Sequence, residues 1–189
     1  LSKIESGIVE FTITPVRLHP LCKEIHDAHI FRCPKGVELI YEPSDENIVI
    51  DGDKNRIFQV ISNLIGNAFK FTTTGHISYG YRREGKYVAF HVTDTGMGIA
   101  PDKGTGYSNV FVKVNNFAQG TGLGLSICKT IIERLGGNIS VTSEVGKGTT
   151  FIFVLPLESS SKTEMEKKEE NNRETTAKAH STEQRSRNT

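Results

Sequence analysis

Residues 63–71 read "NLIGNAFKF" and lie in the longest helix that the sequence predicts. Asp53 is a suitable N-cap residue for this helix. Its apolar positions recur with a period of 3.6 residues and share one face: Ile57, Val60, Ile61, Leu64, Ile65, Ala68 and Phe69. Asn63, Asn67 and Lys70 fall on a second stripe, because helical residues three and four apart are neighbours. Such a stripe can be a buried polar network, a solvated face, or a face where an amide oxygen meets Mg²⁺ and the lysine meets phosphate.

Shorter elements surround this helix. Alternating or apolar segments predict strands at residues 8–16, 37–41, 47–50, 76–84, 86–94, 138–143 and 148–156. In the first of these strands Val9, Phe11 and Ile13 share one face. Further helices are predicted at 20–31 and 122–135, and the Gly-rich stretch 95–120 as a loop. Because hairpins separate the helices, we expect a two-layer α/β sandwich, with a mixed, mostly antiparallel sheet covered on one face by three helices.

Charge and composition exclude several classes of function. The chain has 189 residues, with 23 Lys and Arg against 22 Asp and Glu, so no global charge favours nucleic acid or a membrane surface. No apolar run approaches the roughly 20 residues of a membrane span. Three unclustered cysteines are typical of reduced thiols in the cytoplasm. We therefore expect a cytoplasmic domain that contacts neither nucleic acid nor membrane.

The composition changes abruptly after Pro156. Residues 158–189 hold seven Lys or Arg, seven Asp or Glu and no aromatic residue. Such a segment cannot bury enough apolar surface to offset the entropy lost on ordering. We expect a disordered, charged tail.

Two glycine-containing motifs follow the long helix. "DTGMGI" (94–99) begins with an aspartate at the end of a predicted strand. That residue is either an ordinary turn carboxylate or an acceptor for a ligand's amino group, with Gly96 and Gly98 admitting a flat ring. "GTGLGL" (120–125) opens a predicted helix, whose free N–H groups and dipole favour an anion. It lacks the strand that precedes a Rossmann fingerprint, and "GKGT" (146–149) lacks the spacing of a P-loop.

Taken together, these motifs resemble the ATP-binding catalytic domain of bacterial sensor histidine kinases, in the superfamily shared with gyrase, Hsp90 and MutL. "NLIGNAFKF" is similar to the family's N box, "DTGMGI" to its G1 box and "GTGLGL" to its G2 box. "VFVKVNNF" (110–117) is similar to the F box of the lid, and "SEVGKGTTFIFVLP" (143–156) to the closing hairpin. The resemblance implies a Bergerat ATP-binding fold over 8–157, with 1–7 as the end of a dimerisation and phosphoacceptor helix.

The resemblance also implies roles for individual residues. Asn67 would bind Mg²⁺, Lys70 would contact phosphate, and Asp94 would accept from the adenine amino group. Asn63 stands where related ATPases carry a water-activating glutamate, and Lys113 lies near the position of a lid arginine. The implied catalytic residues are Asn63, Lys70 and Lys113. The implied nucleotide-binding residues are Asn63, Asn67, Lys70, Asp94, Gly96, Gly98, Ile99, Phe111, Gly120, Thr121, Gly122, Leu123, Gly124 and Leu125.

The resemblance implies that the γ-phosphoryl group of MgATP passes to a histidine on a separate dimerisation domain, which we expect to lie outside this chain. We therefore expect a monomer that binds ATP and does not phosphorylate itself, with a response regulator's receiver domain as a further partner. An amide is a poor general base, which disfavours a true ATPase of the superfamily. A nucleotide-sensing or interaction module without catalysis is the main alternative.

Two other patterns in the first predicted helix resemble a phosphoacceptor box and a zinc site, but neither assignment is favoured. His26-Asp27 superficially resembles the start of a phosphoacceptor box, but the usual downstream proline is absent. Cys22, His26, His29 and Cys33 share one helical face, which suggests zinc. At about 1.5 Å rise per residue, however, the end positions are roughly 16 Å apart. Bonds of about 2.0–2.3 Å cannot gather all four on one ion, so packing and surface roles are expected.

Overall fold

The computed structural model describes residues 10–44, 47–99, 109–113 and 124–157, and in 109–113 it describes the backbone alone. The main sheet has six strands in the order β2-β4-β5-β8-β7-β6. Their bounds are β2 Val37–Glu42, β4 Gly75–Glu84, β5 Tyr87–Asp94, β6 Asn109–Lys113, β7 Asn138–Glu144 and β8 Gly148–Pro156. The β2–β4 pair is parallel, and the other neighbours in this sheet are antiparallel.

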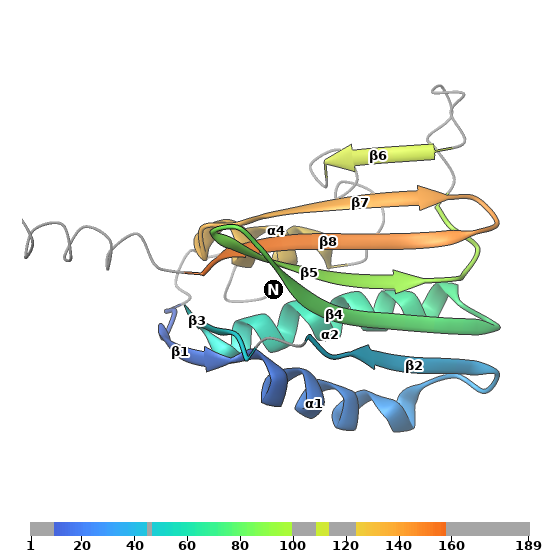
Figure 1. Ribbon diagram of the computed structural model, residues 1–189. Coiled ribbons are helices and arrows are strands. Elements are labelled where there is room, and N and C mark those ends of the chain that lie inside the picture. Colours follow the sequence, from blue (N-terminus) through green and yellow to red (C-terminus); the bar gives the residue numbers. More distant parts are fainter. Residues whose placement is uncertain (1–9, 45–46, 100–108, 114–123, 158–189) are drawn as a thin grey trace, which may run out of the picture. The chain divides into compact units, whose positions relative to one another are not determined.

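Three α-helices belong to the described part of the chain: α1 (Leu18–His29), α2 (Lys54–Phe71) and α4 (Leu125–Arg134). A short 3₁₀ turn, Ile30–Arg32, follows α1. As Figure 1 shows, α2 and α4 lie behind the main sheet, and no helix of the described residues covers its other face. A separate antiparallel pair joins β1 (Thr14–Arg17) to β3 (Val49–Gly52). The predicted two-layer α/β sandwich is confirmed.

The core lies between the helices and one face of the sheet. The predicted apolar face of α2 is buried at Ile57, Val60, Ile61, Leu64, Ile65 and Ala68, with Phe69 partly buried against it. From the sheet, alternate residues of β5 and β8 face the helices, because successive strand side chains point to opposite faces. Phe90 stacks on Phe153 across these strands, with ring centroids 4.5 Å apart. This packing fixes α2 against the strand that ends at Asp94.

The N-terminal strand is shorter than predicted. Residues 10–13 form no strand, and β1 begins at Thr14. The backbone N–H of Thr12 donates to a carboxylate oxygen of Asp53 at 2.9 Å, so a side chain supplies the partner that a neighbouring strand would otherwise supply. Ile13, predicted to share a strand face with Phe11, is 53% exposed, whereas Phe11 is partly buried against the core. The alternating pattern alone was therefore misleading here.

Four other elements differ from the sequence prediction. The stretch predicted as loop contains β6, which pairs with β7. Helix α4 begins at Leu125 and not at Gly122, because Gly124 has φ 65° and ψ 14°, outside the right-handed helical region. The strand predicted at 47–50 lies at Val49–Gly52, in the small sheet. Helix α1 begins at Leu18, which places Pro20 within its first turn, where proline is tolerated. The predicted terminal helix remnant and charged tail lie outside the described residues.

Candidate functional site

The polar stripe of α2 has a graded exposure. Asn63 is half-buried, Asn67 is 9% exposed and Lys70 is exposed. The Lys70 ammonium lies 5.8 Å from the centroid of the Phe71 ring. Because the opposite face of α2 is fixed in the core, these side chains are held on a rigid element along one line. The last turn of α2 thus carries a cation whose charge is open to solvent or ligand.

Asp94 ends β5 and points toward the covered face of the sheet. Val88, Phe90 and Val92 alternate with it on that face. The carboxyl group is 7% exposed, and burial raises its pKa above the ordinary value of 3.8. Backbone hydrogen bonds from Gly96 and Thr149 act in the opposite direction and lower the pKa. A buried carboxylate with a raised pKa is an acceptor that a ligand's hydrogen-bond donor would stabilise.

The residues after Asp94 pass between α2 and the β7–β8 turn. The N–H of Met97 donates to the carbonyl of Phe71 at 3.1 Å, and the Met97 carbonyl accepts from the N–H of Gly146 at 2.9 Å. A Cβ at Gly96 would lie 2.3 Å from the Phe71 carbonyl oxygen. Glycine is therefore required for this close approach of two backbones, and it brings the DTGMGI segment onto the end of α2.

A buried polar cluster supports this segment, and sequence reasoning missed it. The Ser143 hydroxyl accepts from the N–H of Ile99 at 2.8 Å, and it lies 2.8 Å from the Thr149 hydroxyl. Ser143 and Thr149 are 4% and 6% exposed. The alternating patterns of β7 and β8 could have indicated them, because both polar residues fall on the otherwise apolar inner face of the sheet. Thr149 is also the register partner of Asp94.

The start of α4 also contacts α2. The side-chain amide of Asn63 donates to the carbonyl of Gly124 at 3.0 Å and lies 3.2 Å from the sulfur of Cys128. Leu125, the first residue of α4, is 1% exposed and belongs to the core. Helix α2 therefore contacts both predicted glycine motifs, one through Phe71 and the other through Asn63.

The structure describes the remaining predicted site residues only in part. Gly120, Thr121, Gly122 and Leu123 lie outside the described residues. Phe111 and Lys113 lie on β6, where the backbone pairs Phe111 with Thr142 and Lys113 with Ser140. Strands β7 and β8 separate β6 from β5, a distance of about 14 Å at the usual strand spacing. Gly98 has φ 71°, and a Cβ there would lie 2.3 Å from the Glu144 carbonyl oxygen.

Three of the four residues that suggested zinc have separate hydrogen-bond partners, and the fourth, Cys22, is buried in the core. His26 bonds to the Leu39 carbonyl at 3.1 Å, His29 to the Ile25 carbonyl at 2.7 Å, and the Cys33 thiol donates to the Val37 carbonyl at 3.2 Å. Across the described ranges, no three or more His, Cys, Asp or Glu side chains are grouped to hold a metal ion. Their roles are those of packing residues.

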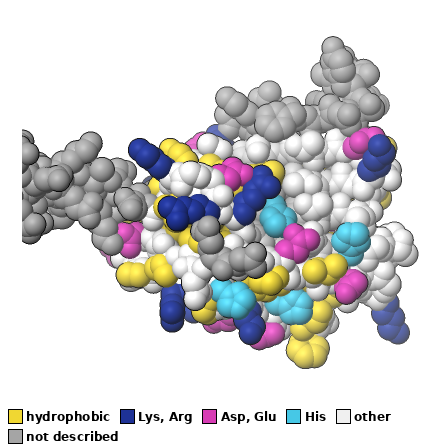
Figure 2. Space-filling model, viewed as in Figure 1, with side chains coloured by type: hydrophobic (Ala, Val, Ile, Leu, Met, Phe, Trp, Pro, Cys, Tyr) yellow, Lys and Arg dark blue, Asp and Glu magenta, His cyan; other side chains and the backbone are white. Residues whose placement is uncertain are grey.

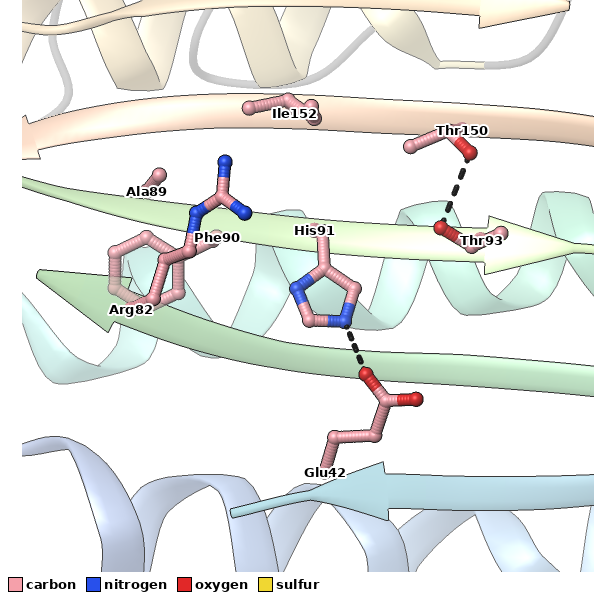
Figure 3. A pocket seen from close by; sticks show the side chains of 8 residues that line it. All are labelled: Glu42, Arg82, Ala89, Phe90, His91, Thr93, Thr150 and Ile152. Carbon is pink, nitrogen blue, oxygen red and sulfur yellow. Dashed lines mark hydrogen bonds and ion pairs between the residues drawn. The ribbon is translucent and has the colours of Figure 1, made fainter. Parts of the chain in front are cut away.

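A hollow of about 290 Å³ lies on the uncovered face of the sheet, away from α2. Figure 3 shows Glu42 of β2 reaching across β4 to His91 of β5, where the carboxylate and imidazole are 2.9 Å apart. The Thr93 and Thr150 hydroxyls are 3.1 Å apart on the same face. In the space-filling view of Figure 2, histidine, acidic and basic side chains are interspersed with hydrophobic ones on the coloured part of this face. Asp94 belongs to the opposite face, so this hollow is separate from the candidate site.

The donor set around α2 fits a nucleotide with Mg²⁺. The Asp94 carboxyl group is a buried hydrogen-bond acceptor, and the glycines at 96 and 98 leave no side chain over the adjoining backbone. The hydroxyl of Thr72 is buried with no hydrogen-bond partner among the described residues, and it would lie 2.9 Å from a Cβ at Gly96. Asn67 carries an amide oxygen, and Mg²⁺ takes oxygen ligands and usually keeps phosphate and water as most of them.

Comparisons with known proteins identify the family. Residues 52–159 match the family described as histidine kinase-, DNA gyrase B-, and HSP90-like ATPase, and this chain belongs to that family. It is similar to the sensor histidine kinase RcsC of Escherichia coli strain K12, with 42% identity over 133 residues. That match covers 68% of this chain and 14% of RcsC, so the chain spans about a seventh of this relative.

Two solved structures extend the comparison. Full-length ShkA in complex with AMPPNP has a TM-score of 0.67 and 30% identity, covering 82% of this chain and 33% of that one. The histidine kinase ThkA in complex with the response regulator protein TrrA has a TM-score of 0.66 and 29% identity, covering 82% of this chain and 45% of that one. Within the described residues, no helix is both long enough and apolar enough to cross a membrane.

Proposed function

We propose that this chain is the ATP-binding kinase domain of a two-component sensor histidine kinase. It would bind MgATP and present the γ-phosphoryl group to a histidine on a separate dimerisation domain. The observation that carries the proposal is the buried Asp94 carboxylate beside Gly96, packed against the helix that carries Asn67 and Lys70. Family membership and the likeness to ShkA in complex with AMPPNP support it.

Each residue has a chemical role in this proposal. Asp94 accepts a hydrogen bond from the adenine amino group, which selects adenine over guanine because guanine has a carbonyl at that position. Asn67 offers an amide oxygen to Mg²⁺, and Lys70 supplies positive charge to the phosphates. When bound, Mg²⁺ neutralises phosphate charge and orients the terminal phosphoryl group. Catalysis is then mainly a matter of position and electrostatics, and the attacking nucleophile comes from another domain.

The glycine motif at 120–125 and the residues on β6 complete the proposed site. Gly120, Thr121, Gly122 and Leu123 are proposed to bind the phosphates, next to the start of α4, where backbone N–H groups favour an anion. Phe111 and Lys113 would belong to the lid, with Lys113 as a second cation for the γ-phosphate. Lysine supplies charge without the bidentate geometry of arginine.

The proposal also names partners and location. The structure of ThkA was solved with a response regulator protein, so a receiver domain is the proposed acceptor of the phosphoryl group after the histidine. The chain by itself would be a cytoplasmic monomer, because in this family dimerisation belongs to the helical domain. It would make no contact of its own with nucleic acid or membrane.

Calorimetric titration of MgATP tests this function. We expect the full chain to bind MgATP and not MgGTP, and Asp94→Asn to lose MgATP binding while its thermal unfolding stays cooperative. Lys70→Ala should weaken MgATP and leave adenosine binding unchanged, whereas Lys147→Ala, which removes an exposed lysine paired with Glu144, should change neither. Absence of MgATP binding by the unmutated chain would overturn the proposal. Phosphoryl transfer to an added dimerisation domain is the next measurement.

A further inference from the structure

The Asn63 amide joins the middle of α2 to the first turn of α4. Its Nδ2 donates to the Gly124 carbonyl at 3.0 Å and faces the Cys128 sulfur at 3.2 Å. The same Gly124 carbonyl accepts from the N–H of Cys128 at 3.3 Å, which is the first hydrogen bond of α4. One carbonyl therefore serves both the helix and the side chain of a neighbouring helix. Gly124 and Asn63 are 61 residues apart in sequence.

Gly124 and Asn63 are sterically matched. Gly124 has φ 65°, a conformation that other residues rarely adopt, and a Cβ at this position would lie 2.5 Å from Nδ2 of Asn63. No side chain of the described residues caps α4 at its N-terminal residue. The described anchors at this point are thus the Asn63 hydrogen bond and the burial of Leu125.

The chemistry of the two partners explains why this residue is an amide. A carbonyl oxygen only accepts hydrogen bonds, and burial raises the pKa of the Cys128 thiol to about 11, so its neutral sulfur is a weak acceptor at neutral pH. An ionised carboxylate in place of the amide has no hydrogen to donate, so its oxygens would face the Gly124 carbonyl and the Cys128 sulfur without a hydrogen bond. The glutamate that related ATPases carry here would therefore remove the contact as well as add a base.

We propose that Asn63 is a positioning residue, which holds the N-terminal turn of α4 on α2 and so sets the backbone N–H groups of that turn opposite Asn67 and Lys70. This inference rests on the proposed function, because its purpose is to place the phosphates of a nucleotide between the two helices. Asn63 acts through Gly124 and is not itself a ligand of the metal or the phosphates. It also explains why Asn63 faces α4 while the other two residues of the stripe lie nearer the end of α2.

Asn63→Asp separates positioning from metal binding. If Asn63 were a Mg²⁺ ligand, a carboxylate at the same position would bind the ion at least as well. As a positioning residue it must donate, so Asn63→Asp and Asn63→Ala should both weaken MgATP binding by about tenfold, the scale of one lost buried hydrogen bond. Adenosine binding, which depends on Asp94, should be unchanged in both variants.

Hydrogen exchange of the nucleotide-free full chain tests the contact itself. In Asn63→Asp the amides of Cys128 and Lys129 should exchange about tenfold faster, and those of β5 should exchange as in the unmutated chain. Gln59→Glu is the matched control: it is the same change on the same helix, and its oxygen can still accept from Arg56 Nη1, which lies 3.0 Å from the Gln59 oxygen. Gly124→Ala should reproduce the Asn63 phenotype from the other side of the contact.

The possible results are distinct. Unchanged exchange at α4 together with unchanged MgATP affinity in Asn63→Asp would overturn the inference. Retained affinity in Asn63→Asp with loss in Asn63→Ala would assign Asn63 to the metal instead. Faster exchange across the whole domain would reduce its role to general stability and also overturn the proposal. Failure of the unmutated chain to bind MgATP would refute the proposed function, and the exchange experiment would still decide whether Asn63 holds α4.

Discussion

The Asp94 carboxylate accepts a hydrogen bond from the N–H of Gly96 at 2.9 Å, two residues further along the chain. This bond turns the backbone at the end of β5, so that the chain leaves the sheet and passes the end of α2. The same carboxyl group is buried, and burial raises its pKa despite the backbone donors around it. A functional group is thus held in an environment that disfavours its charge.

Asp94→Asn should therefore change stability and binding in opposite directions. Because the pKa of Asp94 is raised in the folded state, its contribution to stability is fully present below the unfolded pKa of about 3.9 and is lost as pH rises through the folded pKa. Asparagine removes the buried charge and keeps an oxygen for Gly96. We expect the free energy of unfolding of the variant minus that of the unmutated chain to be largest at pH 8 and to decrease toward pH 4.

Urea denaturation of both proteins at several pH values measures this difference. A relative stability that increases as pH falls would show that the folded-state pKa of Asp94 is depressed, contrary to the expectation. Titration of MgATP at pH 8 completes the test, since the more stable variant should be the one that does not bind.

Two alanine substitutions at glycine should differ in sign. At Gly96 a Cβ would lie 2.3 Å from the Phe71 carbonyl oxygen, so Gly96→Ala should separate the segment from α2 and cost about 1–3 kcal/mol of unfolding free energy. Gly66 lies within α2, and a Cβ there would have no heavy atom within 4 Å. Gly66→Ala should therefore raise the free energy of unfolding by about 1 kcal/mol through helix propensity. Thermal and chemical denaturation check both values. Equal effects of the two changes would show that backbone approach does not determine the stability of the segment at Gly96.

Phe11, three residues before β1, provides a third test. Two guanidinium groups lie near its ring, with the Cζ of Arg56 5.9 Å and that of Arg134 5.6 Å from the ring centroid. Phe11→Ala should lower the free energy of unfolding by about 1–2 kcal/mol, since each such cation–π contact is worth about 0.5–1 kcal/mol. Phe31, which is 94% exposed, is the control, and Phe31→Ala should change stability by less than about 0.5 kcal/mol. A larger loss from Phe31→Ala than from Phe11→Ala would contradict the assignment.

The sequence predicted best those features that depend on local periodicity. The apolar face of α2 was evident because its pattern recurs over more than three turns, from Ile57 to Phe69, and the hairpin of β4 and β5 followed from alternation around Gly85. Strand β6 was missed because five residues among glycines carry little pattern of their own, and its pairing with β7 is a tertiary contact. Residues 10–13 show the reverse case, in which a clear alternation was overridden by the Asp53 carboxylate.

Some features of the candidate site could be proposed from the sequence, and others could not. Asp94, Gly96 and Gly98 were proposed as site residues from residue type and order, and the structure places Gly96 and Met97 against the end of α2 and Gly98 against Glu144. The partner of Asn63 could not be predicted, because a helical stripe specifies which residues share a face and not which distant backbone group they meet. Ser143 and Thr149 were overlooked because hydroxyl residues are common in strands, and only their position on the inner face distinguishes them.

The three cysteines should differ sharply in reactivity. Only the thiolate is nucleophilic, and burial raises the pKa of Cys22 to about 12 and of Cys128 to about 11. At pH 8 the thiolate fraction of Cys128 is then about one in a thousand, and both side chains are also sterically covered, at 0% and 1% exposure. Cys33 is half-buried, with its pKa raised by burial.

Titration with a chromogenic disulfide at pH 8 should therefore modify one thiol in the folded chain and three after unfolding in urea. Cys33→Ser should abolish the first reaction and leave two thiols in urea, whereas two rapidly reacting thiols in the folded chain would mean that α1 or α4 opens readily from the core.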